Sequence, residues 1–142
     1  MAQANTDQGL MPQGMVALVD DEVQIVQALK ALLSFKGVAA SVHESAESLL
    51  AALTQRDGQL WVADADGEPT RLGAVVLDVN LPGMNGADLA AELHRLRPQL
   101  PIVMITAALD EKLLARVQAM PDVTLLSKPF TLESLEQALQ VT

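Results

Sequence analysis

The sequence predicts an α/β domain in which five helices cover a five-stranded parallel sheet. Two observations lead to this prediction: short apolar runs alternate five times with segments of helical periodicity, and the runs are almost continuously apolar. Parallel strands need crossover helices and are buried on both faces, so both observations are expected of a parallel sheet. The chain has 142 residues, half of them hydrophobic, which is enough for one sizeable core.

The amino-terminal half contains two predicted strands and two predicted helices. The apolar run at 15–19 predicts a buried strand, and the helix at 22–35 follows from apolar residues spaced three or four apart. A second strand is predicted at 38–42. Ser45 is a suitable N-cap for the second helix, whose apolar side includes Leu53.

The third strand is predicted at 74–77, where a continuous apolar run leads into a Leu-Pro-Gly turn. Leucines at helical spacing predict the third helix at 86–96. After a loop bracketed by two prolines, the fourth strand is expected at 102–105. Asp110 can cap the fourth helix.

The last apolar run, at 123–126, predicts the fifth strand, and a final helix is expected from about residue 131. One stretch departs from the regular spacing: the link before the third strand is longer than the roughly 2–6 residues usual for such connections. We expect an insertion at about 56–73, with a small hairpin that pairs 60–63 with 70–72.

Trp61 lies in this insertion and has two interpretations. It can pack onto the edge of the domain, which is the more common situation, or it can anchor a partner, since tryptophan is enriched at interface hot spots. Residues 1–14 are polar and have no periodicity, so they are predicted to form a flexible extension before a domain at 15–142.

The composition excludes several classes of function. The net charge of −9 and the presence of only two Phe, one Trp and no Tyr disfavour direct nucleic-acid binding, which needs basic surface and stacking rings. The absence of cysteine excludes disulfides, thiol catalysis and thiolate metal sites. No apolar stretch is long enough to span a membrane and no signal pattern is visible, so a cytoplasmic location is expected.

Five polar residues stand at the ends of apolar runs: Asp20, Asp21, Asp78, Thr106 and Lys128. At the carboxyl ends of parallel strands such side chains meet in one crevice. Three carboxylates, a hydroxyl and an ammonium in a small space make chemical sense if a divalent cation and a phosphoryl group lie between them. Taken singly, each residue has an ordinary structural interpretation, such as a helix cap for the adjacent acids or a solvated surface lysine.

The segments VDDE at 19–22, LDVNLPGMNG at 77–86, IT at 105–106 and KPF at 128–130 resemble the receiver domain of bacterial two-component response regulators. The resemblance covers about 15–141 and is specific, because five separated positions agree in residue type, order and strand context. It implies a flavodoxin-like fold with strand order 2-1-3-4-5. It also implies no enzyme activity beyond the domain's own phosphoryl transfer and dephosphorylation.

The resemblance assigns the chemistry to Asp78, which would accept a phosphoryl group from a histidine kinase or a histidine phosphotransfer protein. Mg²⁺ would be held by Asp21, Asp78 and the backbone carbonyl of Asn80. Asp20 would orient metal-bound water. Hard oxygen ligands of this kind suit a partly hydrated Mg²⁺.

The resemblance also assigns a switch. Lys128 would pair with Asp78 before phosphorylation and with a phosphoryl oxygen afterwards, and the following peptide bond, to Pro129, would be cis. Thr106 would donate its hydroxyl to the phosphoryl group, with the small Ala107 letting backbone amides approach. Leu125 stands where many receivers have an aromatic residue that changes rotamer, so half of the usual switch is missing.

Three further expectations concern the lifetime of the phosphorylated form, the two histidines and the downstream partner. Asn80 and Ala108 are expected to flank the path of hydrolytic water and to influence the lifetime of the phosphorylated form. His43 and His94 have no metal-like spacing and are expected at the surface. Downstream, the domain is expected to act on a protein partner, either as a stand-alone receiver or as part of a longer protein.

Two other functions stay open beside the phosphoacceptor. One is a receiver-shaped adaptor that is never phosphorylated and acts by protein contact alone, which Leu125 keeps possible. The other is a hydrolase or nucleotide-binding enzyme, which ranks last because Asp20 and Asp21 follow the first strand where a Gly-rich phosphate loop would be needed.

Overall fold

The computed structural model describes residues 14–63, 67–107 and 111–139 and contains the predicted parallel sheet. Its five parallel strands occur in the order β2, β1, β5, β6, β7, which is the predicted order 2-1-3-4-5. These strands are β1 (Met15–Val19), β2 (Ala40–His43), β5 (Thr70–Asp78), β6 (Ile102–Thr106) and β7 (Val123–Ser127).

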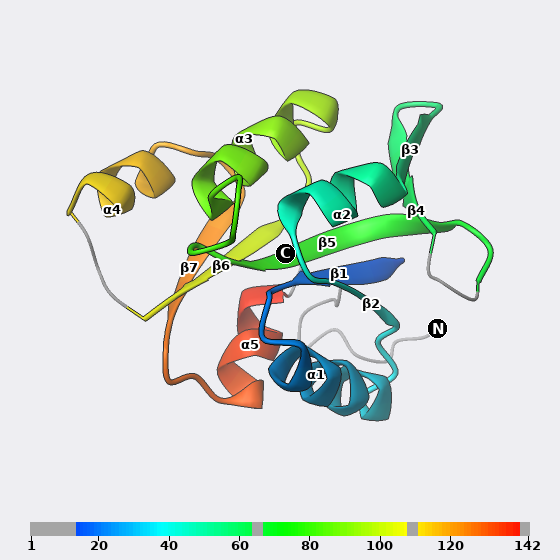
Figure 1. Cartoon of the computed structure of the whole chain (residues 1–142), viewed down its shortest axis with the longest axis horizontal. Coiled ribbons are helices and arrows are strands. Elements are labelled where there is room, and N and C mark those ends of the chain that lie inside the picture. The colour runs from blue at the N-terminus through cyan, green and yellow to red at the C-terminus, as the bar shows by residue number, and fades with distance from the viewer. Residues whose placement is uncertain (1–13, 64–66, 108–110, 140–142) are drawn as a thin grey trace, which may run out of the picture.

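Five helices cover the two faces of the sheet (Figure 1). On one face lie α1 (Val23–Phe35) and α5 (Leu132–Leu139). On the other lie α2 (Ala46–Ala52), α3 (Gly86–Leu96) and α4 (Glu111–Gln118). This is the doubly wound arrangement that the alternation of strands and helices predicts.

The strands supply a core to each face because successive side chains of a strand point in opposite directions. In β1, Ala17 and Val19 belong to the core under α2, α3 and α4, whereas Val16 and Leu18 belong to the core under α1 and α5. All five residues of β1 and all five of β6 are buried. Burial on both faces explains why these strands are continuous apolar runs rather than alternating ones.

The predicted number of strands is wrong, because two antiparallel strands extend the sheet from five strands to seven. The helix predicted to include Leu53 ends at Ala52, and Leu53 begins β3 (Leu53–Arg56), which pairs with β4 (Gln59–Val62). Between them Asp57 and Gly58 both have positive φ, 55° and 75°, as a two-residue type I′ turn requires. The Asp-Gly pair is therefore the sequence signal of this hairpin.

The expected pairing of 60–63 with 70–72 is present, since Val62 pairs with Thr70 and Trp61 with Arg71. The third parallel strand consequently begins at Thr70 rather than at 74. Trp61 itself is half-buried, and the Arg56 guanidinium lies over its ring, 5.8 Å from the centroid.

The surface position predicted for His43 is also wrong. His43 is buried, and its Nε2 lies 2.8 Å from the Ser41 hydroxyl. His94 is half-buried, with its Nε2 2.9 Å from the carbonyl oxygen of Leu100. Both rings are therefore held in structural contacts. The predicted extension, apart from Gly14, and the positions of Ala108 and Asp110 lie outside the described residues.

Within the described part of the chain, no helix has the length and apolar character needed to cross a bilayer.

Candidate functional site

The predicted site residues meet at the carboxyl edge of the parallel sheet. Asp20 follows β1, Asp78 ends β5, Thr106 ends β6 and Lys128 follows β7. The strands that carry them are hydrogen-bonded neighbours. Asp20, Asp78 and Thr106 are buried, with residue exposures of 8%, 7% and 1%. Three polar residues buried at one sheet edge are unusual unless they interact with one another or with a ligand.

Asp78 and Lys128 form the central contact of the site. The Nζ of Lys128 donates to Oδ2 of Asp78 over 2.8 Å. This hydrogen bond, together with the nearby negative charges of Asp78, Asp20 and Glu22, raises the pKa of the Lys128 ammonium, and partial burial opposes the shift. The ammonium is therefore a stable positive charge at the site. The Lys128–Pro129 peptide bond is cis, as predicted.

The other oxygen of Asp78 is held by the backbone. The amide of Asn80 donates to Oδ1 over 2.8 Å, so both carboxylate oxygens accept a defined hydrogen bond. The amide of Val79 donates to the carbonyl of Ile105 over 2.9 Å and continues the β5–β6 pairing past Asp78. These bonds fix the direction of the carboxylate relative to the sheet edge.

The start of α3 packs closely behind Asp78. The amide of Gly86 donates to the carbonyl of Val79 over 3.0 Å, and a Cβ at Gly86 would lie 2.6 Å from the carbonyl oxygen of Asp78. Asn85 caps the helix by accepting a hydrogen bond from the amide of Asp88 over 2.9 Å. The Asn-Gly pair thus allows the helix to begin against the strand end that carries Asp78.

Asp20 and Asp21 differ in their surroundings. Asp20 is buried and its Oδ1 accepts a hydrogen bond from the amide of Glu22 over 3.0 Å, whereas Asp21 is exposed. Burial raises the pKa of the Asp20 carboxyl, with the amide of Glu22 opposing the shift and the charge of Asp78 adding to it. Asp20 therefore accepts a hydrogen bond just before α1, whose N-cap is Glu22, and it also interacts with the charge of Asp78.

The donor set can be tested for a divalent cation. In the described ranges, no three acidic or histidine side chains are grouped closely enough to enclose a metal ion by themselves. A Mg²⁺ ion keeps several waters and needs only one or two carboxylates, so carboxylates of Asp21 and Asp78 with a carbonyl of Asn80 are chemically suitable. Burial, and to a smaller degree the charge of Asp78, raises the pKa of the Asp20 carboxyl, and a cation beside these two residues would offset the cost of ionising it.

The predicted switch residues lie in different environments. Thr106 is buried at the end of β6, and its carbonyl accepts a hydrogen bond from the amide of Lys128 over 2.8 Å. Ala107 is exposed. Leu125 is half-buried and packs against the core under α2, α3 and α4, opposite Met104 of β6. Leu125 therefore occupies the sheet face that α4 covers.

Glu22 was not predicted as a site residue. Its Oε1 lies 3.9 Å from the Nζ of Lys128. The signal was available, because Glu22 is the third acid of the VDDE segment. Helical periodicity assigned it to the first turn of a helix instead.

Comparison with known proteins agrees with this geometry. The family described as "Response regulator receiver domain" matches residues 16–140. The C4-dicarboxylate transport transcriptional regulatory protein DctD of Pseudomonas aeruginosa is 30% identical over 133 residues, which cover 91% of this chain and 26% of DctD. The transcriptional regulatory protein FixJ of Rhizobium meliloti is 29% identical over 127 residues, covering 87% of this chain and 55% of FixJ. The chain thus spans between about a quarter and about half of these relatives.

Solved structures show the same fold. The non-phosphorylated HemR receiver domain of Leptospira biflexa superposes with a TM-score of 0.70 at 22% identity, covering 90% of this chain and 95% of that one. The signal receiver domain of an HD domain-containing protein from Pseudomonas fluorescens gives 0.68 at 27% identity, covering 88% and 90%.

Proposed function

Because the chain belongs to the response regulator receiver domain family, we propose that it is a phosphoacceptor switch whose Asp78 receives a phosphoryl group from a histidine kinase or a histidine phosphotransfer protein. The observation that supports this most strongly is the Asp78 carboxylate, buried at the sheet edge and held by Lys128 and the amide of Asn80. Its oxygens are positioned by contacts on both sides.

The proposed step is a transfer between a phosphohistidine and a carboxylate. One Asp78 oxygen forms a bond to phosphorus while the phosphorus–nitrogen bond of the donor breaks, and the electron pair returns to the imidazole. Lys128 holds one oxygen of this carboxylate, and after the transfer its ammonium would contact a phosphoryl oxygen. Catalysis by the domain then consists of positioning and charge stabilisation, and it is limited to its own phosphorylation and dephosphorylation.

We propose Mg²⁺ as the cofactor. Asp21, Asp78 and the backbone carbonyl of Asn80 would hold it, and Asp20 would orient a metal-bound water. When bound, the ion supplies positive charge that offsets the approach of phosphoryl oxygens to an acidic site. The burial of Asp20 next to Asp78 supports this assignment, because both carboxylates benefit from a counter-charge.

The output of the switch is proposed to pass through Thr106. Its hydroxyl would bind a phosphoryl oxygen and draw the segment that begins at Ala107 towards the site. Leu125 would repack where other receivers turn an aromatic ring. Phosphorylation can favour the active arrangement only through its different interaction with the two states. The result would be altered contact with a downstream protein in the cytoplasm, without direct nucleic-acid binding.

The test is incubation with acetyl phosphate and Mg²⁺ followed by intact-protein mass spectrometry. The wild type should gain one phosphoryl group, and Asp78→Asn should gain none. Asp57→Asn is the matched control, because Asn-Gly suits the same type I′ turn and Asp57 is remote from the sheet edge. No gain in the wild type, or an equal gain in Asp78→Asn, would contradict the proposal.

Leu125 favours one second candidate, a receiver-shaped adaptor that acts by contact without being phosphorylated. An aliphatic residue at this place removes the aromatic part of the usual switch. The same mass measurement separates the two candidates, because the adaptor would not gain a phosphoryl group. A pull-down with phosphorylated and unphosphorylated protein then identifies partners that distinguish the two forms.

A further inference from the structure

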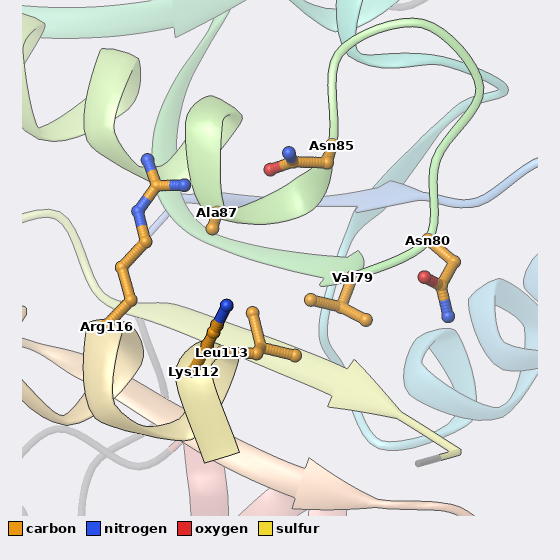
Figure 2. A pocket seen from close by; sticks show the side chains of 7 residues that line it. All are labelled: Val79, Asn80, Asn85, Ala87, Lys112, Leu113 and Arg116. Carbon is orange, nitrogen blue, oxygen red and sulfur yellow. The ribbon is translucent and has the colours of Figure 1, made fainter. Parts of the chain in front are cut away.

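A cavity of about 310 Å³ lies between the loop after β5 and helix α4 (Figure 2). One wall comes from the β5–α3 connection and the start of α3, through Asn80, Asn85 and Ala87. The other comes from α4, through Lys112 and Arg116. Val79 and Leu113 complete the lining. Asn80 is the one lining residue with a role in the phosphoryl transfer proposed above, and there it acts through its backbone carbonyl.

The wall from α4 is positively charged. Lys112 and Arg116 are four residues apart and therefore lie on the same side of the helix, and Figure 2 shows both reaching from α4 towards α3. The whole chain has only 9 basic residues against 18 acidic ones. Two of these few cations thus line one wall of the cavity, and one of them is paired with Asp88 of α3.

Arg116 is held in place by a neighbour. Its Nη2 donates to Oδ1 of Asp88 over 2.8 Å, across from α4 to α3. A guanidinium carries five N–H donors in a rigid plane, so one contact positions the group and leaves other donors for a second acceptor. The salt bridge therefore orients Arg116 and leaves other N–H groups of its guanidinium to donate to a ligand.

The opposite wall adds a hydrogen-bond donor and the remaining lining is apolar. Asn85 lines the cavity from the start of α3, and its Oδ1 accepts from the amide of Asp88, which leaves the Nδ2 group of this side chain as its donor. Val79 and Leu113 supply aliphatic surface. The combination of two cations, an amide donor and a small apolar area matches a ligand with one anionic group on a short apolar body.

We propose that this cavity binds a small organic anion. Its carboxylate or other anionic group would lie against Lys112 and Arg116, and its apolar part would contact Val79 and Leu113. The volume is at the lower end of the roughly 300–1,000 Å³ of small-molecule sites, which favours a ligand about the size of an aromatic carboxylate over a nucleotide. The site does not depend on phosphorylation of Asp78.

The experiment uses benzoate as the probe, with benzyl alcohol and benzylamine as neutral and cationic molecules of similar shape. Amide chemical shifts are recorded in Mg²⁺-free buffer at constant ionic strength, on the wild type and on Asp78→Asn. Benzoate should shift the amides of Val79, Asn80, Asn85 and Leu113 in both proteins, whereas benzylamine should not. Binding in Asp78→Asn separates this inference from the proposed phosphoacceptor function.

Charge-removing variants locate the site. Lys112→Gln and Arg116→Gln should each weaken benzoate binding at least several-fold. Lys30→Gln, on α1 at the other face of the sheet, is the matched control and should bind as the wild type does. Thermal melts of all variants establish that they fold, and Lys112→Gln removes a charge without breaking the salt bridge of Arg116 with Asp88.

Three results would overturn the inference. The first is the absence of benzoate-dependent shifts around the cavity at millimolar probe. The second is a response of equal size to benzyl alcohol, and the third is a benzoate response that survives in both Lys112→Gln and Arg116→Gln. Either of the last two would show that the anionic group is not recognised there.

Discussion

The ammonium nitrogen of Lys128 lies 2.8 Å from Oδ2 of Asp78, although the two residues are 50 positions apart in the chain. The contact joins β5 and β7, which are not neighbours in the sheet, across the end of β6. Lys128 has a side-chain exposure of 30% and Asp78 of 9%, so the pair is partly shielded from solvent. This shielding strengthens its electrostatic effect relative to that of a surface pair.

Replacement of Lys128 by Gln should therefore slow phosphorylation. We expect the rate of phosphoryl gain from acetyl phosphate to fall on the order of 100-fold, the usual effect of removing one charge-stabilising donor from an active site. Quench-flow or timed mass measurements give the rate. Lys36→Gln is the control, since Lys36 forms only an exposed 3.9 Å contact with Glu136. An unchanged rate in Lys128→Gln would remove Lys128 from the mechanism.

Replacement of Gly86 by Ala should disturb both stability and phosphorylation. The added methyl would lie 2.6 Å from the Asp78 carbonyl and 2.8 Å from a methyl of Leu77, so the start of α3 must move. Overpacking of this kind costs about 1–3 kcal/mol, which urea unfolding measures. Gly37→Ala is the comparison: apart from its chain neighbours nothing lies within 4 Å of the added Cβ, but its φ of 82° strains an alanine, so it should lower stability and leave the phosphorylation rate unchanged.

The pH dependence of stability should differ between the wild type and Asp20→Asn. The raised pKa of Asp20 means that the folded protein holds this proton more tightly than the unfolded chain does. The corresponding stability is complete below the ordinary pKa of 3.8 and is lost as the pH rises through the raised pKa. Asparagine does not ionise and keeps the oxygen that accepts from Glu22, so Asp20→Asn should be the more stable protein at pH 7.

Urea titrations in EDTA at pH 4, 5, 6 and 7 test this directly. The advantage of Asp20→Asn should shrink as the pH falls towards 3.8. A constant difference across the range would mean that ionisation of Asp20 does not affect folding.

Mg²⁺ should stabilise the wild type, and the effect should grow with the logarithm of its concentration above the dissociation constant. A ligand at 100 times its dissociation constant adds about 2.7 kcal/mol to the free energy of unfolding. We expect the melting temperature to rise with Mg²⁺ concentration at constant ionic strength, and the rise to be reduced in Asp21→Asn. Asp57→Asn, in the remote hairpin turn, should respond as the wild type does. An equal response of Asp21→Asn would exclude Asp21 as a ligand.

Trp61→Ala should lower the stability of the domain. The side chain is half-buried, and within the described residues its buried indole nitrogen has no hydrogen-bond partner, so the ring should contribute to stability through burial rather than through a hydrogen bond. For a half-buried ring we expect a loss of about 1–3 kcal/mol in urea unfolding. Arg56→Gln, which removes only the cation above the ring, should cost about 0.5–1 kcal/mol. An unaltered stability of Trp61→Ala would favour the interpretation of Trp61 as a partner anchor.

Much of the fold was predictable because periodicity and burial agree. The helix at 86–96 was predicted with its observed bounds, since leucines at helical spacing and the Asn-Gly start coincide. Leu53 was misassigned because its spacing continues the apolar side of α2, while its pairing partner Val62 is determined only by the turn at Asp57 and Gly58. Local periodicity could not decide between these two assignments.

Most residues of the candidate site were also predictable, but from their order along the chain rather than from periodicity. Strand-end positions of Asp20, Asp78, Thr106 and Lys128 follow from the order of apolar runs, so their convergence required only a parallel sheet. Glu22 was missed because an acidic residue in the first turn of a helix is ordinarily exposed to solvent and has no further role. The cations of the cavity, Lys112 and Arg116, had no signal in the sequence beyond their helical spacing.

Residue type and order along the chain were enough to predict the parallel sheet, the family and the phosphoacceptor candidate. The interactions of these residues are visible in the folded chain alone: Lys128 contacts Asp78, Asp20 is buried and Asp21 exposed, and α4 faces the loop after β5 across a cavity. Hydrogen bonds, burial and cavities depend on distances between segments far apart in the chain, and local patterns do not specify those distances.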